Sequence, residues 1–298
     1  MQNDLLIAVL AGLGGMLGWG LADFFAKKTI DQIGDTVSLA WGHVFGTISL
    51  LIMAVYQFGV RGQRIVIPND AQTWFFLLFF GALQAAVYLL VYRGFGKGQV
   101  GVLSPVFASF SGLTAVFSIV VFGEVLGGYL PLGLVILFIG IVLINVDLHA
   151  LRSRRLSFAH IPGFKEVALA TLLAAFWTLS WDKFIGGNDW LSYTLFMYTF
   201  MTLVILEVAY AQRLNLFVVR PPIWKFLMLI GLTETVAYLA ISLGYSATPL
   251  TSVVALLSGA FSLPTIILAR IFLKEKITAV QTVGSIIIIM GIMILSVR

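Results

Sequence analysis

Two matching stretches contain the residues best suited to chemistry. Residues 81–88 read Gly-Ala-Leu-Gln-Ala-Ala-Val-Tyr, and residues 231–238, 150 positions later, read Gly-Leu-Thr-Glu-Thr-Val-Ala-Tyr. Both begin with glycine, end with tyrosine and place a polar residue four positions before the tyrosine, Gln84 in the first and Glu234 in the second. The stretches therefore predict two related sides of one chamber, with a charge on one side only.

Glu234 is the strongest candidate for function. It lies near the middle of an apolar run from Trp224 to Tyr245, where an isolated carboxylate costs at least about 2.5 kcal/mol to place in lipid. We therefore expect it to face protein, water or a ligand and to carry a proton or bind a cation. The four-residue spacing puts Tyr238 on the same helical face as Glu234, and Tyr88 on the same face as Gln84. Interhelical hydrogen bonding is the structural alternative for the carboxyl group.

A histidine and three tryptophans also lie inside apolar runs. His43 could relay protons or bind a substrate carboxylate, and an ordinary interhelical hydrogen bond is an equal alternative. Trp19, Trp177 and Trp181 could line a cavity, although packing is the commoner fate of a single tryptophan. We include all four in the predicted substrate site.

Other charged residues suit structural roles. Asp23 precedes Lys27 by four residues, the spacing of an ion pair within a helix, and the adjacent Asp182 and Lys183 are interpreted in the same way. Glu124 and Glu275 stand just ahead of the fifth and tenth apolar runs, where a carboxylate complements the N-terminus of the following helix. We expect both to be helix caps.

The composition is that of an integral, multi-pass membrane protein. The 298 residues are 60% hydrophobic and only 10% charged, against about 25% charged in soluble domains, and the mean hydropathy is +1.04. There are no cysteines, and no basic stretch interleaved with aromatic residues suggests a nucleic-acid partner. The sequence also lacks a Walker A motif, H-E-x-x-H and any Cys/His cluster, so we expect no cofactor, no metal site and no enzymatic activity.

Ten apolar runs are long enough to span a bilayer. We expect an all-α protein with residues 1–146 as a first five-helix repeat, 147–165 as a basic connecting loop and 166–298 as a second five-helix repeat. The runs are 5–26, 37–58, 72–95, 100–122, 129–146, 167–185, 191–211, 224–245, 250–272 and 278–297.

The two halves repeat each other, and an odd number of spans in each half makes the repeat inverted. Gly94 matches Gly244 at an offset of 150, and Gly133 matches Gly284 and Gly140 matches Gly291 at an offset of 151. The fourth and ninth runs are both rich in small residues, and the ninth contains Pro264. We therefore expect helix interruptions at matching places in the two halves, which point to a binding site.

The positive charges assign a side to each connection. Of the 18 lysines and arginines, 14 flank the odd-numbered connections between runs, and only Arg61, Arg64, Lys183 and Arg298 flank the other side. The positive-inside rule then puts both termini outside the cytoplasm. The expected location is a bacterial or archaeal plasma membrane.

Two inverted five-helix repeats in about 300 residues, a Trp near the start of each half, and a Glu at the close of the fourth and ninth helices resemble the drug/metabolite transporter (DMT) superfamily, EamA branch. The resemblance covers essentially the whole chain. It implies an alternating-access carrier with ten transmembrane helices and a central cavity lined by the first four helices of each half. Its characterised members usually have cytoplasmic termini, the reverse of the orientation that the charges give.

The residues and the resemblance together favour a secondary transporter for a small organic metabolite, such as an amino acid, an amine or a drug-like solute. Its partners are then the substrate, a coupled proton or cation and the lipid bilayer, and it acts as a monomer or a homodimer. A membrane sensor or structural protein, which does not transport, is the first alternative. A polytopic membrane enzyme is the second, although only scattered Glu, His and Ser residues are available to it.

Overall fold

The computed structural model describes residues 2–97, 100–146, 161–272, 274 and 276–296. Within these residues the fold is all-helical, as the sequence predicts. The helices are α1 (Gln2–Ile33), α2 (Asp35–Arg61), α3 (Ala71–Lys97), α4 (Val100–Val120), α5 (Leu130–Asn145), α7 (Phe164–Ile185), α8 (Trp190–Ala211), α9 (Pro221–Ala247), α10 (Thr251–Gly259), α11 (Ser262–Phe272) and α12 (Ala279–Ser296).

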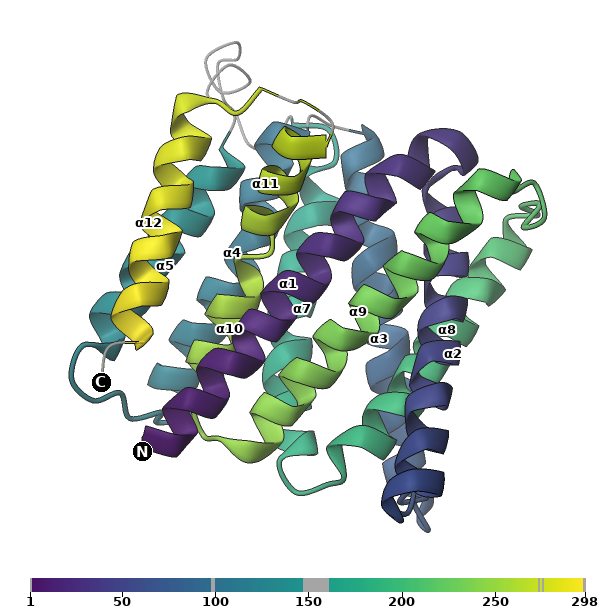
Figure 1. Ribbon diagram of the computed structural model, residues 1–298, viewed down its shortest axis with the longest axis horizontal. Helices are drawn as coiled ribbons and strands as arrows, with labels where there is room; N and C mark the ends of the chain where they lie inside the picture. Colours follow the sequence, from purple (N-terminus) through teal and green to yellow (C-terminus); the bar gives the residue numbers. More distant parts are fainter. Residues whose placement is uncertain (1, 98–99, 147–160, 273, 275, 297–298) are drawn as a thin grey trace.

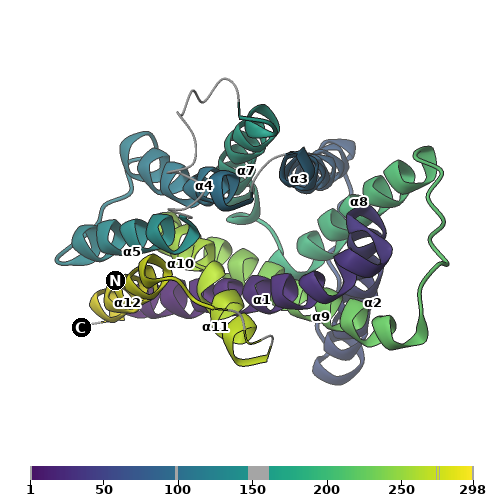
Figure 2. The ribbon, with the colours of Figure 1, turned by 90° about the horizontal axis from the view of Figure 1, so that it is seen from above.

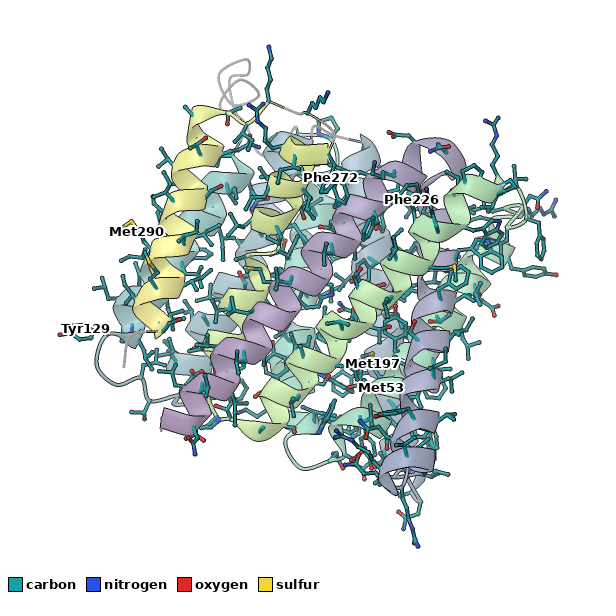
Figure 3. All side chains as sticks on the ribbon, in the orientation of Figure 1. Met53, Tyr129, Met197, Phe226, Phe272 and Met290 are labelled. Carbon is teal, nitrogen blue, oxygen red and sulfur yellow. The ribbon has the colours of Figure 1, made fainter. Side chains whose placement is uncertain are left out.

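Every predicted apolar run is helical, and the ninth run is divided between α10 and α11. By length and composition, seven helical segments of the described chain suit a membrane span, and α5 and part of α4 are shorter apolar helices. Large apolar side chains cover the outside: Met290 is 45% exposed and Phe272 is 65% exposed. Figure 3 shows these side chains projecting outward, as expected of a surface that faces lipid.

The expectation of matching interruptions in the two halves is wrong, because α4 continues unbroken. The break in the second half follows from Pro264, which has no N–H to continue the helix. Pro264 instead lies in the first turn of α11, where that N–H is not needed. The Ala260 carbonyl, whose helical donor would be the missing N–H of Pro264, accepts a hydrogen bond from the Leu263 N–H at 2.9 Å.

Helices of one half pack mainly against helices of the other half. Helix α1 lies along α9 and α10, and the equivalent α7 lies along α3 and α4. In the same way α2 contacts α9 while α8 contacts α3, and the α2–α8 and α5–α12 pairs join equivalent helices. Figures 1 and 2 show this interleaving, with α1 running between α9 and α10. Equivalent helices of the two halves therefore make equivalent contacts with the opposite half, in agreement with the predicted repeat.

The glycines that match between the halves lie at equivalent helix crossings. A Cβ atom on Gly231 of α9 would lie 2.4 Å from the backbone nitrogen of Gly46 in α2. A Cβ atom on Gly81 of α3 would lie 2.7 Å from the backbone oxygen of Met197 in α8. Because these contacts are with backbone atoms, only glycine permits the approach.

Both ends of the described chain lie at one end of the molecule. Figure 1 shows this end at the bottom, together with the connections α2–α3, α4–α5, α7–α8 and α9–α10; we call it the lower end. The α1–α2 and α8–α9 connections lie at the opposite, upper end, where α3 and α11 end and α4 and α12 begin. Residues 147–160 of the predicted basic loop lie outside the described residues.

Glu124 does not cap the helix that follows it. Its carboxylate accepts hydrogen bonds from the Ser252 N–H at 2.9 Å and from the Ser252 hydroxyl, at the start of α10, and from the Ser118 hydroxyl at 2.5 Å. The expectation of a cap on α5 is therefore wrong, since the capped helix belongs to the other half. Glu275, for which we made the same prediction, lies outside the described residues.

Candidate functional site

Glu234 lies at the centre of the contact between the halves. Helix α9 places it against α2 and α8, and only 3% of the residue is exposed. The Tyr198 hydroxyl of α8 donates a hydrogen bond to its Oε2 at 2.9 Å, and His43 Nε2 of α2 lies 3.6 Å from its Oε1. The carboxylate therefore touches one side chain from each half.

The backbone around His43 determines where its hydrogens lie. Its Nδ1 is 2.9 Å from the Leu39 carbonyl oxygen, which can only accept, so Nδ1 is the donor. In the neutral ring the Nε2 lone pair then faces Glu234, and in the charged ring an N–H faces it. The ring also stacks on Tyr198, with centroids 5.2 Å apart and planes 15° apart. His43 Nε2 itself has no hydrogen-bond partner among the described residues.

Small residues make room for this contact. A Cβ atom on Gly46 would lie 2.2 Å from the Tyr198 hydroxyl oxygen, so glycine is required beside it. The Thr235 hydroxyl donates to the Gly46 carbonyl at 3.1 Å, and the Thr202 hydroxyl donates to the His43 carbonyl at 3.2 Å. These bonds between helices hold α2, α8 and α9 in register around Glu234.

The other three residues of the repeated stretches meet beside Glu234. Gln84 Nε2 donates to the Tyr238 hydroxyl at 3.0 Å, and that hydroxyl lies 3.5 Å from the Tyr88 hydroxyl. Gln84 and Tyr238 come from different halves, as the repeat predicts. The structure therefore brings together the four residues singled out first in the sequence.

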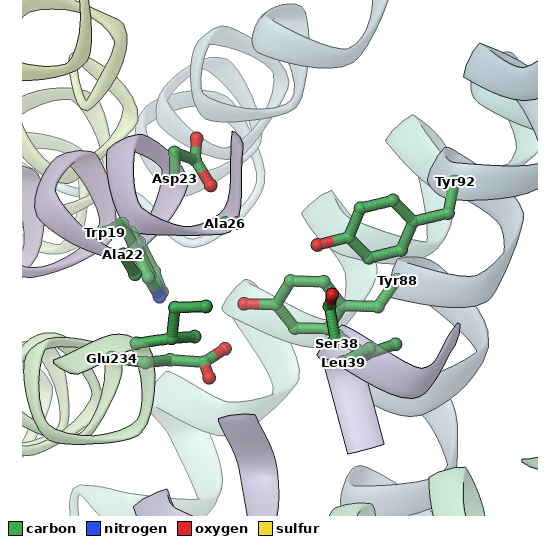
Figure 4. A pocket seen from close by; sticks show the side chains of 10 residues that line it. Trp19, Ala22, Asp23, Ala26, Ser38, Leu39, Tyr88, Tyr92 and Glu234 are labelled. Carbon is green, nitrogen blue, oxygen red and sulfur yellow. The ribbon is translucent and has the colours of Figure 1, made fainter. Parts of the chain in front are cut away.

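A cavity of about 30 Å³ lies next to Glu234. Figure 4 shows Asp23 and Glu234 on opposite sides of it, with the hydroxyls of Tyr88 and Tyr92 directed between them. Asp23 is exposed whereas Glu234 is buried, so the cavity leads inward from Asp23. One water needs roughly 10–15 Å³, which gives this space room for about two. The remaining lining residues are Trp19, Ala22, Ala26, Ser38, Leu39 and Ile230.

Among the described residues, four polar atoms near the cavity are buried without a hydrogen-bond partner: Trp19 Nε1, Ser38 Oγ, His43 Nε2 and Gln84 Oε1. The Trp19 indole N–H is buried without an acceptor, and Gln84 Oε1 is buried without a donor. Trp19 also stands edge-on to Tyr238, with ring centroids 5.7 Å apart. A buried donor without a partner is unusual in a folded protein, so the Trp19 N–H is available to a ligand.

Trp177 and Trp181 form an aromatic layer below Tyr238. Their rings stack with centroids 5.7 Å apart, and Trp177 packs edge-on against Tyr238 at 6.1 Å. Both indole N–H groups are used, by the Phe80 carbonyl and the Ser242 hydroxyl. Of the predicted site residues, Trp19, Tyr88 and Glu234 line the cavity. His43 and Tyr238 contact residues of this lining and Gln84 bonds to Tyr238, but these three do not line the cavity. Trp177 and Trp181 lie behind Tyr238, farther from the cavity.

Sequence reasoning missed three polar residues of this region. Tyr198 and Tyr92 sit in helices with many aromatic residues, and nothing in their spacing distinguishes them. Asp23, for which the sequence predicts an ion pair with Lys27, also lies in the cavity wall. Its position four residues after Trp19, on the same helical face, is the signal that could have identified it. Among the described residues, no group of three or more His, Asp or Glu side chains is placed to hold a metal ion.

The comparisons with known proteins give the same architecture. A family model described as the EamA-like transporter family matches residues 6–146 and 163–297. A solved structure titled only "Crystal structure of protein" has a TM-score of 0.75 and 15% sequence identity, over 97% of this chain and 96% of that chain; this similarity concerns the fold. No curated protein matches the chain. Because the family model matches one segment in each half and most of the sequence, the chain belongs to the EamA-like transporter family, within the drug/metabolite transporter superfamily.

Proposed function

We propose that the protein is a secondary transporter that moves a small organic solute by alternating access between its two halves, with Glu234 as the site of a coupled proton or of the cationic group of the solute. The observation that carries this proposal is the burial of Glu234 between helices of both halves, at the inner end of a cavity. An ionisable residue inside a membrane is costly to keep and usually functional.

The groups around the cavity favour a solute with an ammonium group and a hydrogen-bond acceptor. Glu234 supplies the negative charge, and the rings of Trp19 and Tyr88 supply faces that attract cations. The unpaired Trp19 N–H supplies a donor for a carboxylate or carbonyl of the solute. An amino acid or an amine that carries such an acceptor has this combination.

The size of the cavity supports a cycle of conformational change. About 30 Å³ is far below the roughly 300–1,000 Å³ of typical small-molecule sites, so binding requires α1, α2 and α3 of the first half to move away from α9 of the second half. Tyr238, Trp177 and Trp181 pack tightly towards the lower end. In the proposed cycle, this layer closes the lower end while the cavity is reached from the side of Asp23.

The proposed moving bodies are the repeats 1–146 and 166–298, and the upper end faces the cytoplasm. Of the 18 lysines and arginines, 14 flank the odd-numbered connections between the apolar runs, which correspond to the upper end. The positive-inside rule then places this end in the cytoplasm. The protein then resides in a plasma membrane with both termini outside the cytoplasm, as a monomer or a homodimer.

Solute uptake into proteoliposomes tests the proposal. Purified protein is reconstituted and supplied with labelled amino acids and amines, with and without a pH gradient. Uptake that exceeds that of protein-free vesicles and that fails in Glu234→Gln is expected. A sensor would bind a solute without flux and an enzyme would convert it, so either outcome would exclude transport as the activity.

A further inference from the structure

A second and larger cavity lies at the lower end of the molecule, away from Glu234. Its volume is about 450 Å³, which is within the range of small-molecule sites. It is formed by the ends of α4, α7 and α9 and by the start of α10, the part of the lower end where these connections gather in Figure 1. The residues of the Glu234 site are not among those that line it.

Two carboxylates from different halves stand in this cavity at fixed positions. Asp182, 5% exposed, accepts a hydrogen bond from the Thr251 hydroxyl at 2.9 Å through Oδ1. Glu124 accepts from Ser252 and Ser118, as described above. These donors fix the orientation of both carboxylates in the cavity.

The ammonium group of Lys183 shows where a cation fits. Its Nζ lies 3.3 Å from Asp182 Oδ2 and 4.7 Å from the ring centroid of Phe122, so a carboxylate from one half and an aromatic face from the other surround it. The Lys183 side chain is nevertheless 55% exposed. The Lys183 ammonium is therefore open to solvent while Asp182 is buried, so another cation can compete for this position beside Asp182.

Tyr245 adds an unused polar group. The residue is only 4% exposed and lines the cavity, and its hydroxyl has no hydrogen-bond partner within the described part of the chain. A ligand in the cavity would therefore find a hydroxyl that can both donate and accept.

We propose that this cavity binds small primary amines, whose ammonium group replaces Lys183 Nζ between Asp182 and Phe122 and whose N–H groups or polar substituents bond to the Tyr245 hydroxyl. A primary ammonium has three donors, and Asp182 and Tyr245 both line the cavity. Lys183 then acts as an internal competitor that occupies the position when no amine is bound. This site is independent of Glu234 and of the proposed transport.

Protection of an introduced cysteine tests the proposal at the cavity itself. The chain has no cysteine, and Val125 lines the cavity and is 87% exposed. Benzylamine is expected to slow the labelling of Val125→Cys by a thiol-specific methanethiosulfonate reagent. The exposed Asn69→Cys, at the same end but outside the cavity, is the matched control and should be labelled at an unchanged rate. Benzyl alcohol, which has the same ring and no charge, should not protect.

Two further substitutions make the test specific. Lys183→Met removes the competing cation and should lower the half-protecting benzylamine concentration by roughly three- to tenfold. Tyr245→Phe should raise that concentration by several-fold. Equal protection by benzyl alcohol, no protection by benzylamine, or weaker protection in Lys183→Met would each overturn the proposal. Loss of solute flux in Glu234→Gln bears on the other site and leaves this result unaffected.

Discussion

Glu234 and His43 face each other across the boundary between the two halves, with 3.6 Å between Oε1 and Nε2. Both are buried, and the other ring nitrogen of His43 is bonded to the Leu39 carbonyl. A movement of α2 relative to α9 changes this distance directly. The surroundings of the Glu234 carboxylate therefore depend on the relative position of the halves.

Replacing Glu234 by glutamine separates coupling from recognition. Glutamine keeps the shape and the hydrogen-bonding capacity but cannot ionise, and it makes this position like Gln84. We expect accumulation driven by a pH gradient to be lost. If the carboxylate also binds the cationic group of the solute, affinity should fall by about 10- to 150-fold, the value of a charge-assisted bond of roughly 1.5 to 3 kcal/mol.

Glu207→Gln is the control for that variant. Glu207 lies on α8 and is exposed, so its replacement removes one carboxylate without touching the cavity. Uptake, counterflow and their pH dependence are measured for both variants in proteoliposomes. Unchanged affinity and unchanged pH dependence in Glu234→Gln would remove Glu234 from the mechanism.

Tyr198→Phe tests the hydrogen bond to Glu234. The substitution deletes only the hydroxyl that donates to Oε2 at 2.9 Å, and a bond to a charged group contributes about 1.5 to 3 kcal/mol. We expect flux to fall while the protein still folds, because the ring stacked on His43 remains. Tyr193→Phe in the same helix is the control, since Tyr193 lies outside this group of contacts. Equal fluxes in the two variants would contradict a role for the bond.

The helices and the repeat could be predicted from the sequence because both follow from local patterns. Apolar runs of about 20 residues must be helical in a membrane, where every backbone polar group needs a partner. The glycines that match between the halves mark the helix crossings in the structure. The break after Gly259 was also signalled, by Pro264, whereas α4 stays unbroken although it contains Pro105.

The candidate site could be predicted only in part, because partners from different helices are not local. The pairing of Gln84 with Tyr238 follows from the repeat, whereas Tyr198 reaches Glu234 through the packing of α8 on α2. Glu124 shows the same limit. Its position in the sequence predicts that it caps the next helix, but in the folded protein its carboxylate binds the start of α10 in the other half.

Cysteines at the two ends test the orientation. We expect an impermeant thiol reagent applied to intact cells to label Asn69→Cys in the α2–α3 connection and to spare Gln212→Cys in the α8–α9 connection. The reason is the excess of positive charge on the side of Gln212. Labelling of both variants in permeabilised cells is the control. The reverse pattern in intact cells would give the termini a cytoplasmic location.

Gly231→Ala tests whether the close approach of α9 to α2 holds the two halves together. The new Cβ would lie 2.4 Å from the Gly46 nitrogen and 2.5 Å from the Gly42 oxygen, and backbone atoms cannot turn away as a side chain can. We expect α9 to shift, with a loss of roughly 1 to 3 kcal/mol of stability and a lower unfolding temperature in detergent.

Gly59→Ala in α2 is the matched control, because a Cβ there meets no atom within 4 Å, and alanine is the better helix former. If both variants unfold at the temperature of the unmodified protein, the crossing does not limit stability. If only Gly231→Ala is destabilised and its solute flux also falls, the same contact fixes Glu234 against His43, since Gly231 lies one turn before Glu234 on α9.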